Sequence, residues 1–357
     1  MPLNSVIIGS GSFIPERVVE NAHFEQHQFH TDQGVQIPGS STDIIRKFEA
    51  ITGIKERRYV TSNYITSDIS TAAAMRAIED SGMDKEEIDV IIVAHNFGDL
   101  MDGSSQTDIL PSLASRVKGK LGIQNPSCIP YDLIFGCPGW LQGMIQADIF
   151  IQSGYARTCL VVGAETLSRV VDPSDRDTMI FADGAGATLV TGKQENTKRG
   201  VLSHAAVSHT GPEVDYLYLG APNLTNQGED TRFIKMQGRK IYEYALNKVP
   251  GAMDKCIRKA GLEVTDLSKI LIHQANEKMD EAIVKRLYRK NGLKDFPPEI
   301  LPMTIEKLGN SSVATIPTLY NMITHNQLPG HSVQSDDHLL FASVGAGMNI
   351  NAMLYRV

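Results

Sequence analysis

The sequence has few cysteines and lacks long apolar or basic runs, and each shortage excludes a class of protein. Four cysteines, at positions 128, 137, 159 and 256, form neither CxxC pairs nor the short regular spacing of a disulfide framework or zinc site. No eighteen consecutive residues are apolar, and the N-terminus lacks a basic region followed by a long apolar core. We therefore expect a cytoplasmic protein with neither a signal peptide nor a membrane span.

Positive charge is also scarce. The net charge is −7, and no run of Lys and Arg is long enough to neutralise a row of phosphates. These features exclude a nucleic-acid surface as the main function.

The remaining composition is that of an ordinary globular protein. Hydrophobic residues make up 42% of the 357 residues and charged residues 21%. A chain of this length is long for a single core, so two domains or two fused halves are expected. We place the division between residues 1–195 and 196–357.

Segments with helical spacing of apolar residues alternate with short apolar runs typical of buried strands. We expect helices at 42–51, 67–81, 110–121, 141–153, 238–260, 278–291 and 314–325. We expect strands at 5–9, 88–94, 158–164, 181–191, 269–272, 339–342 and 350–355. The alternation predicts an α/β fold with a mostly parallel sheet in the first half, and a similar series after a loop-rich region at 200–232.

Three stretches near the N-terminus are expected to be irregular. Gly9 and Gly11 follow the first strand and predict a glycine turn. The polar residues 21–41 contain three histidines without partner ligands at fixed offsets, which favours a surface loop over a metal site. The basic residues 52–59 are expected to form an exposed turn.

Cys137 is the candidate nucleophile. It follows the apolar run 131–135, lies between Gly136 and Gly139, and precedes a helical pattern from about residue 141. Unpaired N–H groups and the dipole at a helix N-terminus favour a thiolate over a thiol. A small cysteine buried in a packed turn would have the same local sequence.

Two stretches in the second half offer partners for a thiol nucleophile. His273 ends an apolar strand just before a helix, where ligands usually bind in α/β sheets. Asn310 stands in the polar turn LGNSS at 308–312, where a helix N-cap is the alternative role. The turn GAG at 345–347 has N–H groups that could form half of an oxyanion hole, or it could simply connect two strands.

With these motifs the chain resembles the beta-ketoacyl-acyl-carrier-protein synthases III of the thiolase superfamily. The resemblance spans nearly the whole chain and rests on seven stretches in the correct order, namely TGIKERR (52–58), the Cys137 turn, DPSDR (172–176), DGAGA (183–187), HQAN (273–276), LGNSS and GAG. It implies a thiolase-like fold of two similar βαβ-rich halves in a five-layered α-β-α-β-α arrangement, and a homodimer.

The resemblance also implies a reaction. Cys137 would be acylated by an acyl-CoA or acyl-carrier thioester, and His273 with Asn310 would hold the thioester carbonyl of malonyl-acyl-carrier protein. Decarboxylation would give an enolate that attacks acyl-Cys137, with the oxyanion on the backbone N–H groups of Cys137 and Ala346. The product would be a 3-oxoacyl-acyl-carrier protein, formed without a metal or another cofactor, as the initiating step of fatty acid biosynthesis.

Several positions depart from the family pattern. Pro138 and Trp140 replace the usual residues after the nucleophile, and Trp140 is expected to reshape the acyl pocket. Lys47 stands where a tryptophan helps to hold the CoA adenine, while the matching Arg176 is retained. Leu110 occupies the position from which the partner subunit limits the acyl chain. Ala346 replaces a common glycine.

Lys278, on the helix after His273, matches a position that docks the acidic acyl carrier protein, although an ordinary solvated helix face is the alternative. Other functions also remain open. The chain could be a related ketosynthase or acyltransferase of a specialised lipid or polyketide pathway, or a catalytically silent structural subunit. A cysteine hydrolase is disfavoured, because Phe135 breaks the Gly-x-nucleophile-x-Gly elbow.

Overall fold

The computed structural model describes residues 3–104, 106–224 and 231–357. Its first half contains β1 (Leu3–Phe13), β2 (Arg17–Glu20), α1 (Ser41–Thr52), β3 (Glu56–Tyr59), α2 (Thr66–Ser81), β4 (Val90–Ala94), α3 (Leu113–Leu121), β5 (Ile129–Leu133), α4 (Gly139–Ser153), β6 (Thr158–Thr166) and β7 (Asp183–Gln194). Its second half contains β8 (Gly200–Ser208), β9 (Leu217–Gly220), β10 (Phe233–Met236), α5 (Gly238–Lys259), β11 (Lys269–Ile272), α6 (Glu277–Lys290), α7 (Ile305–Leu308), α8 (Thr315–Thr324), β12 (His338–Gly345) and β13 (Asn349–Arg356).

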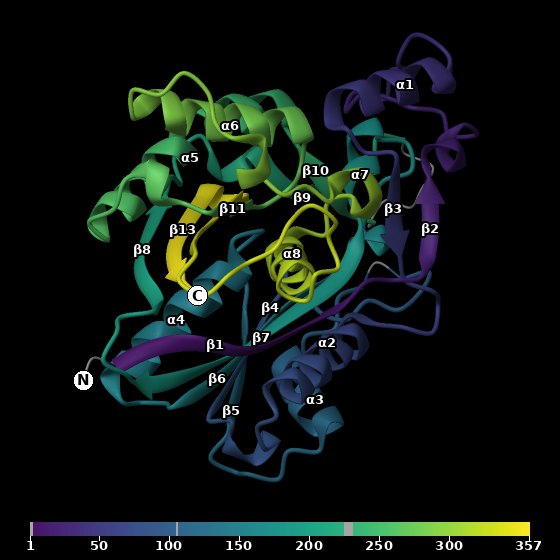
Figure 1. Ribbon diagram of the computed structural model, residues 1–357. Helices are drawn as coiled ribbons and strands as arrows, with labels where there is room; N and C mark the ends of the chain where they lie inside the picture. The colour runs from purple at the N-terminus through teal and green to yellow at the C-terminus, as the bar shows by residue number, and fades with distance from the viewer. Residues whose placement is uncertain (1–2, 105, 225–230) are drawn as a thin grey trace.

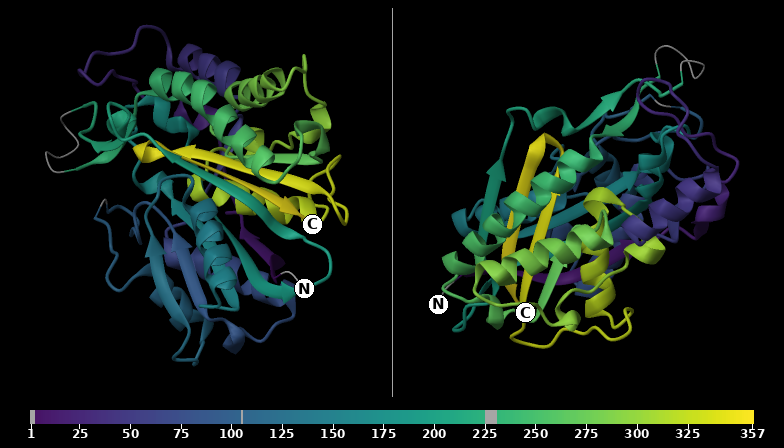
Figure 2. Two further views of the ribbon diagram at one scale, coloured as in Figure 1. Left: turned by 90° about the vertical axis from the view of Figure 1, so that its left-hand side faces the viewer. Right: turned by 90° about the horizontal axis from the view of Figure 1, so that it is seen from above.

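Two sheets and three layers of helices form the predicted five-layered α/β arrangement (Figure 1, Figure 2). Helices α2 and α3 cover the outer face of the first sheet, and α5 and α6 cover that of the second. Helices α4 and α8 lie between the sheets and contact strands of both. A core cluster that includes Trp140 of α4 and Phe341 of β12 fills this central layer. Because α4 is apolar on nearly all sides, it can be buried between two sheets.

The strand directions differ from the predicted mostly parallel sheet. In the first sheet, ordered β1-β7-β6-β4-β5, only the β4–β5 and β4–β6 pairs are parallel. In the second, ordered β11-β12-β13-β8, only β11–β12 is parallel. The region expected to be loop-rich supplies the edge strand β8, which pairs with β13. Strands β6, β7 and β12 are buried on both faces and therefore form apolar runs whatever their direction, so these runs did not reveal which neighbours are antiparallel.

Gly9 and Gly11 do not form the expected turn, because β1 continues through them to Phe13. A Cβ atom at Gly9 would lie 2.2 Å from the carbonyl oxygen of Ala77, and one at Gly11 would lie 2.4 Å from that of Ala73. Both glycines therefore allow the backbone of α2 to pack directly against β1.

The N-terminal segments predicted to be exposed are partly buried. Residues 21–41 are mainly irregular, as expected, but Phe24 and Phe29 enter a core cluster with α1. The basic stretch at 52–59 includes β3, which pairs with β2. Arg57 is completely buried there, against the ring of Phe24, with its guanidinium donating to Met179 O, Val19 O and Asn21 Oδ1. The prediction of an exposed basic turn was wrong at Arg57.

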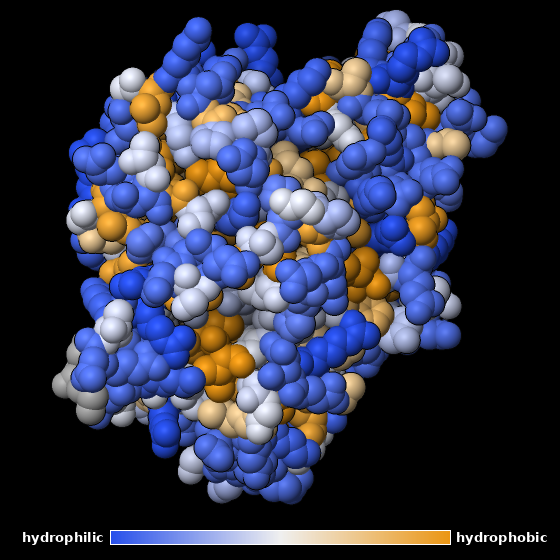
Figure 3. All heavy atoms as spheres, viewed as in Figure 1, coloured by the Kyte–Doolittle hydropathy of each residue, from blue (hydrophilic) through white to orange (hydrophobic). Residues whose placement is uncertain are grey.

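The boundary placed after residue 195 falls between β7 and β8, the last strand of one sheet and the first of the other in sequence. Because α4 and α8 contact both sheets, the existence of two separable domains stays a prediction. Among the described residues, no helix combines the length and apolar character that crossing a membrane would require. The face shown in Figure 3 is mostly hydrophilic, with hydrophobic side chains in small groups.

Candidate active site

Cys137, His273 and Asn310 come from three separate segments and meet around one residue, Ser312. The Ser312 hydroxyl donates to Cys137 Sγ at 3.3 Å, and the Ser312 N–H donates to Asn310 Oδ1 at 2.8 Å. The Ser312 backbone carbonyl interacts with the His273 ring. The structure therefore brings together the three residues that the sequence singled out.

The ends of strands explain this convergence. Cys137 follows β5 and directly precedes α4, while His273 follows β11, with its N–H donating to Ala342 O at 2.8 Å. The two sheets face each other across α4 and α8, so the ends of β5 and β11 come together.

Asn310 is held by backbone pairing rather than by a helix. Its N–H donates to Ile180 O at 2.9 Å, and its carbonyl accepts from Ala182 N–H at 2.8 Å. Helix α8 begins only at Thr315, so Asn310 is not the N-cap that was the alternative role. Because Asn310 Oδ1 accepts from Ser312, the Nδ2 group is the donor that a substrate oxygen can use.

His273 is buried, with 3% of its surface exposed. Burial lowers the pKa of His273 to about 4, and the opposing effect of the Ser312 carbonyl is smaller. The imidazole is therefore neutral at pH 7. Its Nδ1 atom is buried without a hydrogen-bond partner in the described part of the chain, which is typical of a group that completes its bonding with a ligand.

Burial of Cys137 acts against the thiolate that a helix N-terminus favours. Burial raises the pKa of Cys137 to about 11, while Ser312 and the Cys137 N–H lower it less and the nearby Glu165 carboxyl raises it further. Helix α4 begins two residues later, at Gly139. Acylation therefore needs a group that takes up the thiol proton.

The turn that carries Cys137 packs directly against the turn that carries Ala346. A Cβ atom at Gly345 would lie 2.5 Å from Cys137 N, and one at Gly136 would lie 2.8 Å from Ala346 N. Gly136 also has a φ angle of 65°, which disfavours other residues. The two N–H groups named for the oxyanion hole thus belong to adjoining turns, and their role in catalysis stays a prediction.

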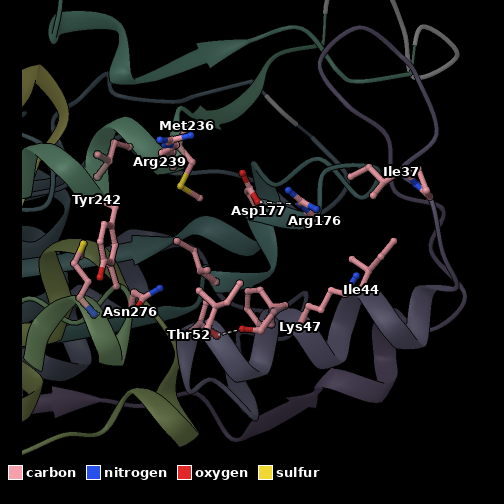
Figure 4. A pocket seen from close by; sticks show the side chains of 18 residues that line it. Ile37, Ile44, Lys47, Thr52, Arg176, Asp177, Met236, Arg239, Tyr242 and Asn276 are labelled. Atoms are coloured by element: carbon pink, nitrogen blue, oxygen red, sulfur yellow. Dashed lines mark hydrogen bonds and ion pairs between the residues drawn. The ribbon is translucent and has the colours of Figure 1, made fainter. Parts of the chain in front are cut away.

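A cavity of about 500 Å³ lies between α1, the segment 176–180, the start of α5 and the start of α6. Figure 4 shows Lys47 on α1 and Arg176 across the cavity, beside Asp177. Its walls also include Ala275 and Asn276, which come two and three residues after His273 in sequence. Both residues expected near the CoA adenine therefore line one cavity, although binding of CoA there stays a prediction.

The other predicted residues lie in different places. Trp140 is buried in the central layer and packs against Phe341 at 5.8 Å between ring centroids, so its direct role is in the core. Leu110 is 87% exposed and precedes α3, which begins at Leu113 instead of the predicted residue 110. Lys278 is exposed on the first turn of α6, next to Asn276 and Met279 of the cavity. Their contacts with substrates or partners are untested.

Sequence reasoning missed two residues next to the nucleophile, and gave Ser312 no role. Glu165 lies near the end of β6 and Asn96 follows β4, so both share the sheet edge where Cys137 stands. Asn96 Nδ2 donates both to Glu165 and, at 3.2 Å, to Ser312 Oγ. The available signal was a carboxylate at the end of an otherwise apolar strand, CLVVGAET.

Comparison with known proteins agrees with this geometry. Residues 131–209 match the model of the 3-oxoacyl-[acyl-carrier-protein (ACP)] synthase III family, and residues 257–357 match its C-terminal model. The chain is 35% identical over 361 residues to beta-ketoacyl-[acyl-carrier-protein] synthase III of Clostridium acetobutylicum, and 32% identical over 355 residues to that of Staphylococcus haemolyticus. Each alignment covers 99% of both chains.

Solved structures show the same relationship. The crystal structure of 3-oxoacyl-[acyl-carrier-protein] synthase III from Aquifex aeolicus has a TM-score of 0.79 and 28% sequence identity, over 99% of this chain and 100% of that one. Matches of this extent include the Cys137 turn and both of its partner segments. The chain therefore belongs to the 3-oxoacyl-[acyl-carrier-protein] synthase III family, and its architecture is the thiolase-like fold.

Proposed function

We propose that this protein catalyses the decarboxylating condensation of an acyl thioester with malonyl-acyl-carrier protein to give a 3-oxoacyl-acyl-carrier protein, the initiating step of fatty acid biosynthesis. The observation that carries the proposal is the meeting of Cys137, His273 and Asn310 around Ser312 in a member of this family. A thiol beside two neutral hydrogen-bond donors fits acyl transfer followed by enolate formation.

In the first half-reaction the Cys137 sulfur attacks the carbonyl of the acyl thioester. The backbone N–H groups of Cys137 and Ala346, which belong to two adjoining turns, stabilise the tetrahedral oxyanion by hydrogen bonding. The carbon–sulfur bond to the donor then breaks, the acyl group stays on Cys137, and the donor leaves as a thiol after taking up a proton.

In the second half-reaction His273 and Asn310 Nδ2 donate to the thioester carbonyl of the malonyl group. Loss of carbon dioxide leaves an enolate, whose charge these donors stabilise. Because His273 is neutral, it can lower the energy of the enolate without protonating it fully. The enolate carbon attacks acyl-Cys137, forms the new carbon–carbon bond and releases the cysteine.

The cavity lined by Lys47 and Arg176 is proposed to receive the donor. Two cations on opposite walls suit the phosphates of CoA or of a carrier-bound phosphopantetheine, and the apolar lining between them suits the uncharged arm. Lys278, exposed at the rim, is proposed to contact the acidic carrier protein.

We further propose a homodimer formed through β5. In the described residues, β5 is an edge strand that pairs only with β4. Exposed apolar side chains gather in β5 and the neighbouring segments before and after it, namely Met101, Ile109, Leu110, Ile129 and Ile134. A second copy on this face would cover them and bring Leu110 towards the other active site.

Intact-protein mass spectrometry tests the reaction. Wild type and Cys137→Ser are incubated with acyl-CoAs and acyl-carrier thioesters of different chain length, and then with malonyl-acyl-carrier protein. We expect a single acyl mass on wild type, its discharge with release of carbon dioxide, and no label on the variant. A wild-type protein that no donor labels would contradict the proposal and favour a silent subunit.

A further inference from the structure

Glu165 is a buried carboxyl group beside the nucleophile that the mechanism above does not use. Only 1% of its surface is exposed, and it lies near the end of β6, on the sheet edge where Cys137 follows β5. Burying a carboxyl group is unfavourable unless its oxygens are hydrogen-bonded, so its contacts indicate why it is there.

Those contacts lead to the nucleophile in two steps. Asn96 Nδ2 donates to Glu165 Oε1 and, at 3.2 Å, to Ser312 Oγ. The Ser312 hydroxyl also interacts with the Glu165 carboxyl, and it lies 3.3 Å from Cys137 Sγ. Ser312 thus stands between the thiol and the carboxyl, and Asn96 holds both in place.

The hydrogen-bonding capacity of Ser312 fits this position. A hydroxyl has two lone pairs and one rotatable hydrogen. In the resting arrangement Ser312 Oγ accepts from Asn96 and donates its hydrogen to Cys137 Sγ. Rotation of the O–H bond turns that hydrogen to Glu165 and lets Oγ accept from the Cys137 thiol. The left-handed backbone of Ser312, with φ of 52°, places the hydroxyl at this junction.

The other ionisable groups around Glu165 have different partners. Asp183 of β7 accepts from Ser168 and from the Val60 N–H, and His95, after β4, contacts Asp132 at 2.9 Å. His273 lies beyond Ser312 and is neutral. Glu165 is therefore the carboxyl group connected to the thiol through Ser312.

We infer that Glu165 accepts the Cys137 proton through Ser312 during acylation, and that it is a positioning and proton-accepting residue acting through that serine. As the sulfur–carbon bond forms, the S–H bond breaks, its proton passes to Ser312 Oγ, and the Ser312 proton passes to the Glu165 carboxylate. When the bond to the leaving group breaks, the same route returns a proton to the departing thiolate. No other reactant is needed.

The acidity of the groups agrees with this role. Burial raises the pKa of Glu165 to about 8, and that of Cys137 to about 11. A carboxylate of such basicity is a far better proton acceptor for a thiol than an ordinary glutamate, because general bases work best near the operating pH.

A simple electrostatic role predicts the opposite result. The negative charge of Glu165 disfavours a thiolate at Cys137, so removing the charge alone would make the cysteine react faster. Removing a proton acceptor would make it react more slowly. Glu165→Gln keeps the size and hydrogen bonding of the side chain and therefore separates the two roles.

The inference rests on acylation of Cys137, so its test uses an acyl donor that needs no CoA or carrier recognition. Wild type, Glu165→Gln, Ser312→Ala and the double variant are treated with p-nitrophenyl acetate between pH 6 and 9.5. Acetylation is followed by nitrophenolate release and by intact mass, with Cys137→Ser as the background. The other three cysteines are buried.

We expect the wild-type rate to rise with a midpoint near pH 8. Each single variant should be acetylated at least about tenfold more slowly than wild type at pH 8, and its rate should lack the rise centred near pH 8. The double variant should be acetylated no more slowly than either single variant. Thermal unfolding verifies that each variant folds. If Glu165→Gln does not fold, the acetylation rate of Ser312→Ala alone tests whether the proton passes through Ser312.

Equal or faster acetylation of Glu165→Gln, additive losses in the double variant, or no acetylation of wild-type Cys137 would overturn the inference. If p-nitrophenyl acetate labels wild type while no acyl thioester does, the proposed condensation fails, yet the comparison of variants still decides the role of Glu165.

Discussion

At the scale of single residues, the active site combines groups that are costly to bury. His273 and Glu165 are each at least 97% buried, and burial shifts their pKa values in opposite directions, to about 4 and about 8. Both side chains are therefore predominantly neutral at pH 7. A neutral interior is suited to stabilising a transient enolate, because fixed hydrogen-bond donors act strongly where water is excluded.

Glu165 should also make stability depend on pH. Its folded-state pKa of about 8 lies above the unfolded value of 4.5, so the folded state holds a proton that the unfolded state loses. The resulting stabilisation is complete below pH 4.5 and is lost as the pH rises towards 8.

We therefore expect Glu165→Gln to gain stability relative to wild type by roughly 3 to 5 kcal/mol between pH 4.5 and pH 8.5. Denaturant unfolding at several pH values measures the difference. The slope due to His273 has the opposite sign between pH 4 and 6.5 and cancels, because both proteins retain that residue. Parallel pH profiles for the two proteins would show that Glu165 ionises normally.

At the scale of elements, the site is formed by two turns packed backbone to backbone. Gly345 ends β12 with an extended φ of −164°, so its backbone conformation is open to any residue. Space is the constraint, since a Cβ atom there would meet Cys137 N at 2.5 Å and Pro138 Cδ at 2.7 Å.

Gly345→Ala should consequently separate the Cys137 and Ala346 turns. We expect the acylation rate to fall by about a hundredfold, as for other misplacements of about 1 Å, and the free energy of unfolding to fall by about 1 to 3 kcal/mol. Acyl labelling by mass spectrometry and denaturant unfolding provide the two measurements.

Gly251→Ala is the matched control, because Gly251 lies in α5 and a Cβ atom there would contact nothing within 4 Å. This variant should keep full activity and gain up to about 1 kcal/mol of stability. Normal acylation of Gly345→Ala would mean that the turns tolerate separation and that their N–H groups do not act together.

At the scale of the whole molecule, the apolar surface around β5 predicts assembly. Ile129 on β5 is 46% exposed, and Val18 on the separate β2–β3 ribbon is 42% exposed. Both are apolar residues on strands, but only Ile129 lies on the face proposed to contact a second copy.

We expect wild type and Val18→Lys to be dimers, and Ile129→Lys to be mainly monomeric at micromolar concentration, because a charge is costly to bury in an interface. Light scattering coupled to size exclusion gives the masses. A monomeric wild type, or a dimer unaffected by Ile129→Lys, would assign the exposed apolar residues another role.

Much of the fold followed from local patterns. Helix α4 and strand β11 occur almost where apolar spacing placed them, because each buries the face that its sequence makes apolar. The strands missed, β2, β3, β8, β9 and β10, lie in two-stranded ribbons or at a sheet edge, and all but β8 have only four residues, too few for an apolar pattern to stand out.

The sequence by itself determined which chemistry is present. Cys137, His273 and Asn310 stand in motifs specific enough to indicate the family, because each motif needs particular residues in a fixed local order. Tertiary structure alone decided that Ser312 joins all three, that Glu165 and Asn96 stand behind it, and that burial raises the pKa of Cys137. These properties depend on burial and on contacts between residues up to 216 positions apart, which local sequence does not encode.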